Sequence, residues 1–225
     1  GGIMNLGKVG IIFGGGGLTG AFSAGYIKAI LENGIKPEII QGVSVGALNA
    51  AVILESGPEK LEKTWLEIEK KGAQTIFNWY DIPGNVAWKR ISLYNNKGIV
   101  QILNSINMEM VLASPIEFQI VTCTEQEEEM CIFSTKQKEL QNNPELLRKV
   151  ILASTALQGF LPPVIIDGES YIDNIVFSIQ PLIDAKCDTI FVLLNDQGKE
   201  KNRWDRRISR FYQRSCDKEI LTELD

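Results

Sequence analysis

The sequence predicts an α/β protein in which helices cover a mostly parallel central sheet. Residues 8–13 (KVGIIF) and 38–43 (EIIQGV) are short apolar runs that end at glycines, which is typical of buried strands. Each run is followed by a segment with helical spacing of apolar residues, at 20–33 and 45–55. A strand–helix–strand–helix order is typical of parallel strands joined by helical crossovers.

The rest of the chain continues this alternation without a repeat or a linker. We expect helices at 58–71, 98–106, 143–155 and 202–215, strands at 117–126, 128–135 and 187–196, and a hairpin at 162–173 that turns at Asp167-Gly168-Glu169. We therefore expect a single domain over residues 3–225. Gly1 and Gly2 precede Met4 and are expected to be an expression remnant.

Composition excludes several classes of protein. The chain has 225 residues, of which 44% are hydrophobic, enough for one sizeable core. A formal net charge of −5 argues against a nucleic-acid binder. Four scattered cysteines and no histidine fit reduced thiols and argue against a transition-metal site. Because reduced thiols are typical of the cytosol, we expect a cytoplasmic protein, with peripheral membrane contact left open. No stretch approaches the roughly 18 apolar residues of a membrane span.

The first candidate for chemistry is Gly-x-Ser-x-Gly at residues 42–46 (GVSVG). This pattern is typical of a nucleophilic serine on a sharp turn between a strand and a helix. The simpler interpretation is a tight turn that happens to contain a serine. An apolar strand before Ser44 and a helix of small residues after it favour the nucleophile, and the helix N-terminus would stabilise a developing anion there.

A second candidate is the glycine run GGGGLTG at residues 14–20. It contains G-x-G-x-x-G, but a dinucleotide site also needs an acidic residue at the end of the next strand, and Glu38 lies at that strand's beginning. No Gly-Lys-Ser/Thr closes a phosphate-binding loop either. Unobstructed backbone N–H groups beside Ser44 would instead suit an oxyanion hole.

A nucleophilic serine needs a base, and the chain has no histidine to serve. Lys8 precedes the first strand and Lys28 lies on a helix with an ordinary surface pattern, so neither is favoured. Asp167 is explained by the Asp-Gly turn. Asp173 ends the hairpin, where a carboxyl could face the site with a pKa raised by poor solvation. From the residues alone, a structural cap explains Asp173 equally well.

Two aromatic regions raise the question of lipid contact. The aromatic residues in the middle of the chain would line an acyl-chain groove or a membrane-facing lid, or form ordinary core. They are Trp65, Trp79, Tyr80, Trp88 and Tyr94. The predicted terminal helix carries five arginines beside aromatic residues. It would meet anionic headgroups or remain a solvated helix.

Four motifs together resemble the patatin-like phospholipase family over nearly the whole chain. They are GGGLTG (15–20), GVSVG (42–46), ASTALQGFLPPV (153–164) and YIDNI (171–175). The resemblance implies a three-layer α/β/α fold and a Ser–Asp dyad that works without histidine. Carried over to this chain, it makes Ser44 the nucleophile and Asp173 the base. The resemblance also implies an oxyanion loop at Gly15, Gly16 and Gly17, with Gly20, Gly42, Gly46 and Asn174 as supporting motif residues.

Two departures from the family pattern bear on activity. Thr19 stands where the family has Arg or Lys, and the family's Asp-Gly-Gly/Ala reads Asp173-Asn174-Ile175, with Ile179 in place of a following asparagine. Asparagine tolerates left-handed backbone angles better than isoleucine does.

The leading hypothesis is a lipid acyl hydrolase of the phospholipase A or esterase type, acting on a phospholipid or other lipid ester without metal or organic cofactor. The alternative is a catalytically weak lipid-binding or scaffold protein on the same fold. A nucleotide-binding α/β protein is a third and less favoured hypothesis. The sequence leaves the oligomeric state and the identity of the lipid open.

Overall fold

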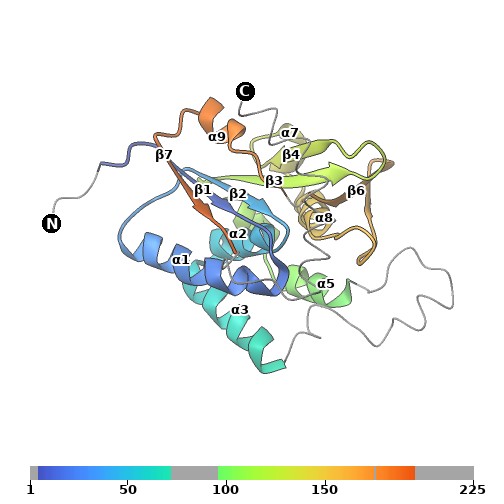
Figure 1. Ribbon diagram of the computed structural model, residues 1–225, viewed down its shortest axis with the longest axis horizontal. Coiled ribbons are helices and arrows are strands. Elements are labelled where there is room, and N and C mark those ends of the chain that lie inside the picture. Colours follow the sequence, from blue (N-terminus) through green and yellow to red (C-terminus); the bar gives the residue numbers. More distant parts are fainter. Residues whose placement is uncertain (1–4, 72–95, 175, 196–225) are drawn as a thin grey trace, which may run out of the picture. The chain divides into compact units, whose positions relative to one another are not determined.

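The computed structural model describes residues 5–71, 96–174 and 176–195, which all belong to one compact unit (Figure 1). It is a mixed α/β fold around a sheet of mostly parallel strands. The strands are β1 (Val9–Phe13), β2 (Ile39–Val43), β3 (Glu117–Thr124), β4 (Met130–Ser134), β5 (Val164–Ile166), β6 (Glu169–Asp173) and β7 (Thr189–Leu193). Within the described ranges no helix is both long and apolar enough to cross a membrane.

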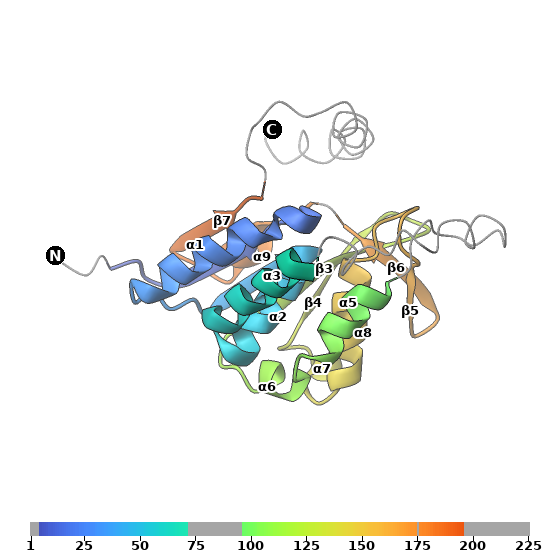
Figure 2. The ribbon, with the colours of Figure 1, turned by 90° about the horizontal axis from the view of Figure 1, so that it is seen from below.

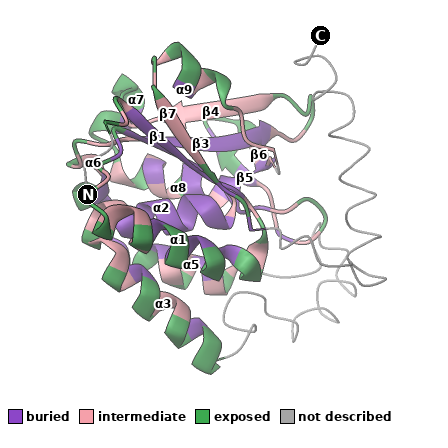
Figure 3. Cartoon of the chain, turned by 60° about the vertical axis from the view of Figure 1, so that its left-hand side comes forward, coloured by how far each residue is buried: buried purple, intermediate pink, exposed green. Residues whose placement is uncertain are grey.

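Helices pack against this sheet, and most of the longer ones share one face. They are α1 (Gly20–Glu32), α2 (Val45–Ser56), α3 (Pro58–Lys71), α5 (Lys97–Asn104), α6 (Met108–Leu112), α7 (Lys138–Gln141), α8 (Pro144–Ser154) and α9 (Gln180–Asp184), with a 3₁₀ turn η1 at Gly17–Thr19. Figure 2 shows α1, α2 and α3 side by side. α2 is the most deeply buried helix of this group, as its purple colour in Figure 3 shows.

The strand order is β5-β6-β3-β2-β1-β7, with β4 also paired to β3. β1 lies parallel to both β2 and β7, and β2 lies parallel to β3, whereas β4, β5 and β6 pair antiparallel. Successive side chains of β1 point to opposite faces of the sheet. Ile11 and Phe13 enter the large core beneath α1 and α2, while Ile12 packs with Ile39 and with Leu182 of α9.

The register on β3 brings the ends of β2 and β6 together. Val121 pairs with Val43 of β2 on one side and with Ile132 of β4 on the other. The next residue, Thr122, pairs with β4 on that same side and with Asp173 of β6 on the opposite one. β2 and β6 therefore pair with successive segments of the same edge of β3. The C-terminal end of β2 consequently lies next to Asp173.

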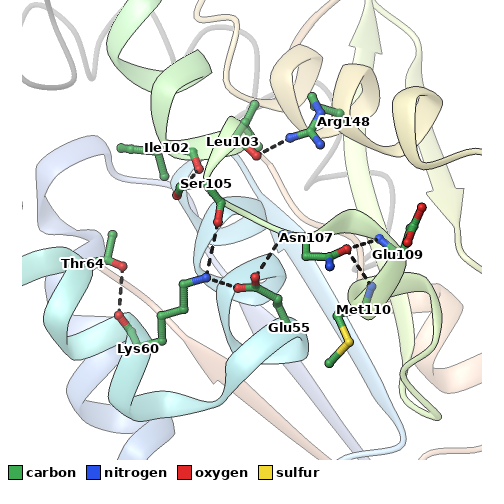
Figure 4. Close-up of polar contacts among 10 residues, drawn as sticks. All are labelled: Glu55, Lys60, Thr64, Ile102, Leu103, Ser105, Asn107, Glu109, Met110 and Arg148. Carbon is green, nitrogen blue, oxygen red and sulfur yellow. Dashed lines mark hydrogen bonds and ion pairs between the residues drawn. The ribbon is translucent and has the colours of Figure 1, made fainter.

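A polar network away from this junction ties the helices together (Figure 4). The Glu55 carboxylate, at the end of α2, forms an ion pair with Lys60 of α3 and accepts a hydrogen bond from the Asn107 N–H (3.0 Å). Its side chain is only 8% exposed. Burial acts to raise the pKa of Glu55, but the hydrogen bonds from Lys60 and Asn107 outweigh it, so the pKa lies below its ordinary value.

We expect Glu55→Gln to lower the free energy of unfolding by about 1–2 kcal/mol at pH 7, because Lys60 loses its charged partner. A carboxyl whose pKa is lowered by folding stabilises the protein above its unfolded pKa, about 4.3 for glutamate. The difference between wild type and variant should therefore shrink as the pH falls below that value. Urea unfolding at several pH values measures it.

Glu67→Gln is the matched control, because Glu67 pairs with Lys71 at 3.6 Å on an exposed surface. We expect it to change the free energy of unfolding by less than about 0.5 kcal/mol. If the two variants lost the same free energy of unfolding, the stabilising role of the Glu55 carboxylate between the helices would be contradicted.

Candidate active site

Ser44 lies on a sharp turn between β2 and α2. Its backbone angles are φ 56° and ψ −127°, a conformation that costs a non-glycine residue of order 1–3 kcal/mol. A buried serine, Ser154 at the end of α8, holds the turn: its Oγ accepts a hydrogen bond from the Ser44 N–H (2.9 Å) and donates to the Val121 carbonyl (2.7 Å). Ser154 belongs to the Ala-Ser-x-Ala motif, but nothing in the sequence alone gives it this role.

The glycines that flank Ser44 allow a very close approach of α2 to the sheet. A Cβ at Gly42 would lie 2.6 Å from the Ala47 Cα, and one at Gly46 would lie 2.2 Å from the Phe13 carbonyl oxygen. Both neighbours are backbone atoms, which cannot swing aside as the end of a flexible side chain can. The sequence pattern Gly-x-Ser-x-Gly therefore has a steric explanation at both glycines.

We expect Gly46→Ala to lower the free energy of unfolding by about 3 kcal/mol, because the added methyl group overlaps the Phe13 carbonyl. Gly25→Ala on α1 is the control, since a Cβ there meets no atom within 4 Å. It should stabilise the helix by about 0.5–1 kcal/mol. Urea unfolding measures both variants, and a Gly46→Ala protein as stable as wild type would refute the steric explanation.

The glycine loop lies beside Ser44 because β1 and β2 are adjacent and parallel. A Cβ at Gly15 would be 3.4 Å from the Ser44 Cβ. Gly16 and Gly17 have φ values of 144° and 57°, which favour glycine. In the described part of the chain, the N–H groups of Gly15, Gly16 and Gly17 donate to no protein acceptor. They are free to bind an anion next to Ser44.

Asp173 is the last residue of β6 and only 8% exposed. Its N–H donates to the Ala156 carbonyl (3.0 Å). Burial raises the pKa of Asp173 to about 7, although a hydrogen bond with the Ser44 side chain acts to lower it. The Oδ1 atom is buried and has no hydrogen-bond partner among the described residues. The structure thus brings together Ser44, an unusually basic carboxyl and the glycine loop.

The other supporting residues have distinct positions. A Cβ at Gly20 would meet Val45 (2.7 Å) and Trp65 (2.9 Å), so this glycine permits packing of α1 on α2 and α3. Asn174 follows β6 and does not have a positive φ, so it needs no left-handed conformation there. The backbone of Ile175 lies outside the described residues. The Thr19 hydroxyl donates to the Gly16 carbonyl (2.8 Å), within the loop itself.

The lysines that the sequence disfavours as bases are engaged elsewhere. Lys8 donates to the Ala185 carbonyl (2.8 Å), and Lys28 forms an ion pair with Glu62 (2.6 Å). Asp167 lies with Gly168 in the hairpin turn, both at positive φ, as an Asp-Gly turn requires.

Trp65 of α3 is the one aromatic candidate for lipid contact that the described residues include, since Trp79, Tyr80, Trp88, Tyr94 and the predicted terminal helix lie outside them. Its indole N–H donates to the Asn49 side chain (3.0 Å), and it packs against the core. Trp65 also lines a groove of about 590 Å³ between α1 and α3, with Leu18 and Leu66 among the other lining residues.

These features define an α/β protein with a serine on a strand-to-helix elbow, beside a buried carboxyl and a glycine loop. A family model described as patatin-like phospholipase matches residues 11–178. The chain therefore belongs to the patatin-like phospholipase family.

Comparisons with individual proteins agree with this family at low identity. The chain is 26% identical over 214 residues to lysophospholipase NTE1 of Eremothecium gossypii, covering 89% of this chain and 12% of that protein. It is 26% identical over 180 residues to neuropathy target esterase sws of Drosophila persimilis, covering 75% of this chain and 11% of that protein. The chain thus spans only a small part of these relatives.

Two solved structures are similar to the chain. VipD from Legionella pneumophila has a TM-score of 0.48 and 14% identity, covering 77% of this chain and 46% of that one. The type III effector protein ExoU has a TM-score of 0.39 and 11% identity, covering 89% of this chain and 50% of that one.

Proposed function

We propose that this protein is a lipid acyl hydrolase that cleaves carboxylic esters through an acyl-enzyme on Ser44. The observation that carries the proposal is the position of the buried Asp173 carboxyl, whose pKa is raised to about 7 by burial. It lies at the end of β6, next to the end of β2 where the strained elbow presents Ser44. Membership of the patatin-like phospholipase family supports a lipid ester as the substrate. We also propose that residues 3–225 form a single hydrolase domain that needs no cofactor.

In the first half of the reaction, the Ser44 Oγ attacks the ester carbonyl carbon and its proton passes to the Asp173 carboxylate. The carbonyl oxygen becomes an anion that the N–H groups of Gly15, Gly16 and Gly17 stabilise. When the tetrahedral intermediate collapses, the bond to the alcohol breaks. The departing alcohol takes the proton from Asp173, leaving the acyl group on Ser44.

In the second half, a water molecule gives a proton to Asp173 and attacks the acyl-enzyme. Collapse of the second tetrahedral intermediate releases the fatty acid and returns the proton to the Ser44 oxygen. One carboxyl thus serves as base and acid twice in each cycle. A pKa near 7 suits this work, because the carboxylate form is well populated near neutral pH and is still basic enough to accept the proton.

The second candidate is a lipid-binding protein of weak or no activity. The observation in its favour is Asn174-Ile175, which replaces the glycine-containing pair that follows the aspartate in the family pattern. Both candidates share the fold and the lipid partner, so only the reactivity of Ser44 separates them.

The test is turnover of a p-nitrophenyl ester together with labelling by a fluorophosphonate probe. Wild type should hydrolyse the ester and take up one probe at Ser44, and Ser44→Ala should lose about 1,000-fold or more in rate and all labelling. Ser105→Ala is the control, because Ser105 is an exposed serine at the end of α5. Full activity of Ser44→Ala would refute the mechanism, and an unreactive wild type would favour the second candidate.

A further inference from the structure

Asn195, two residues after β7, is a buried polar residue that the sequence motifs do not include. The residue is only 5% exposed, and both polar atoms of its side chain are hydrogen-bonded. The Nδ2 group donates to the carbonyl oxygens of Gly14 (2.9 Å) and Gly15 (3.2 Å), and the Oδ1 atom accepts from the Ser23 hydroxyl (2.5 Å). Carbonyl oxygens only accept, so the amide nitrogen must face the loop.

These two hydrogen bonds also set the direction of two N–H groups. In a planar trans peptide, the carbonyl of one residue and the N–H of the next point in opposite directions, and the described chain has no cis peptide bond. The Gly14 carbonyl shares a peptide with the Gly15 N–H, and the Gly15 carbonyl shares one with the Gly16 N–H. By holding both carbonyls, Asn195 turns both N–H groups away from itself.

The loop needs hydrogen bonds from outside to fix its conformation, because four successive glycines have little conformational preference of their own. Backbone contacts fix its two ends: the Gly14 N–H donates to the Leu193 carbonyl (3.0 Å), and the Gly16 carbonyl accepts from Thr19. Asn195 is the side chain that holds the carbonyls between these ends within the described part of the chain. Ser23, fully buried on α1, orients the amide.

We propose that Asn195, oriented by Ser23, is a positioning residue that aims the N–H groups of Gly15 and Gly16 at the oxyanion of the reacting ester. This inference rests on the proposed hydrolase function. Asn195 acts through the loop, because its side chain is hydrogen-bonded to Gly14, Gly15 and Ser23. The N–H groups matter most when negative charge develops on the ester oxygen, so their misalignment should slow turnover more than it weakens substrate binding.

The variant Asn195→Asp tests this directly, because it keeps the size of the side chain but replaces the donor by an oxygen that repels both carbonyls. We expect kcat for a p-nitrophenyl ester to fall about 100-fold or more, while KM changes less than about threefold. The affinity for a trifluoromethyl ketone, which forms a tetrahedral adduct, should fall with kcat/KM. The pH midpoint of the rate, set by Asp173, should stay where it is. Ser23→Ala, which leaves the donor in place, should lower kcat by a smaller factor.

Asn33→Asp is the matched control. Asn33 also donates from its amide to a backbone carbonyl, that of Ala29 (2.7 Å), but it lies exposed at the end of α1. It should leave kcat and KM unchanged. If Asn195→Asp does not fold, Asn195→Ser and Ser23→Ala provide the same comparison of kcat with KM.

The outcomes separate the inference from the function on which it rests. An active wild type whose Asn195→Asp variant keeps kcat within threefold overturns the inference alone. So does a variant in which kcat, substrate binding and stability fall together, because that is a purely structural defect. A wild type without Ser44-dependent turnover removes the proposed function and the inference with it.

Discussion

Replacement of Asp173 by asparagine is expected to lower kcat/KM for a p-nitrophenyl ester by about 100-fold or more at pH 8. Asparagine has nearly the same shape as aspartate, so the packing at the end of β6 is kept. It cannot accept the proton of the Ser44 hydroxyl, however, and no histidine exists elsewhere in the chain to replace it. Initial rates for purified wild type and variant at the same pH measure the loss.

Stability distinguishes a lost base from a damaged fold. The pKa of Asp173 is about 7 in the folded protein, well above the ordinary value of about 3.9. The folded state therefore binds more protons than the unfolded state between these values, and stability falls as the pH rises through this range. Above pH 7 the buried carboxylate destabilises the fold, so Asp173→Asn should unfold at a higher urea concentration than wild type at pH 8.

Asp167→Asn is the control for this prediction. Asp167 lies exposed in the hairpin turn at φ 50°, a conformation that asparagine adopts readily. It should keep both activity and stability. If Asp173→Asn retained more than a third of wild-type activity, Asp173 would not be the base.

The second large effect is the dependence of the wild-type rate on pH. Ser44 can be deprotonated only when Asp173 is ionised, so kcat/KM should fall about tenfold for each pH unit below 7 and reach a plateau above it. The measurement is ester hydrolysis from pH 5 to 9, read where both forms of the released phenol absorb equally. A rate already constant at pH 5 would indicate a base with an ordinary carboxyl pKa and would exclude a buried Asp173 in this role.

Most of the fold can be predicted from local sequence patterns. The strands around residues 8–13 and 38–43, the helices that follow them, and the turn at Asp167-Gly168 are found where the apolar spacing and the glycines place them. The short helices α6, α7 and α9 are not predicted. Each has only four or five residues, too few to show a clear helical period.

Less of the candidate site can be predicted from local sequence patterns, because the site depends on contacts between segments that are distant in the sequence. The patterns single out Ser44 and the glycine loop, since strained turns and close approaches require glycine at specific positions. The proximity of Asp173 to Ser44 depends on how β2 and β6 share one edge of β3, at Val121 and Thr122. From the residues alone, a base and a structural cap explain Asp173 equally well, and the resemblance to a family is what favours the base. The hydrogen bonds of Ser154 and Asn195 depend on tertiary contacts and have no local signal.

The most direct test of the proposed Ser44–Asp173 dyad is to titrate the Asp173 carboxyl by ¹³C NMR in aspartate-labelled wild type and in Ser44→Ala, with Asp173→Asn to assign the signal. We expect a pKa near 7 in wild type and a higher pKa in Ser44→Ala, because the hydroxyl no longer stabilises the carboxylate. A pKa near 4 in wild type, or identical titrations in the two proteins, would contradict the claim that Asp173 and Ser44 act as one unit.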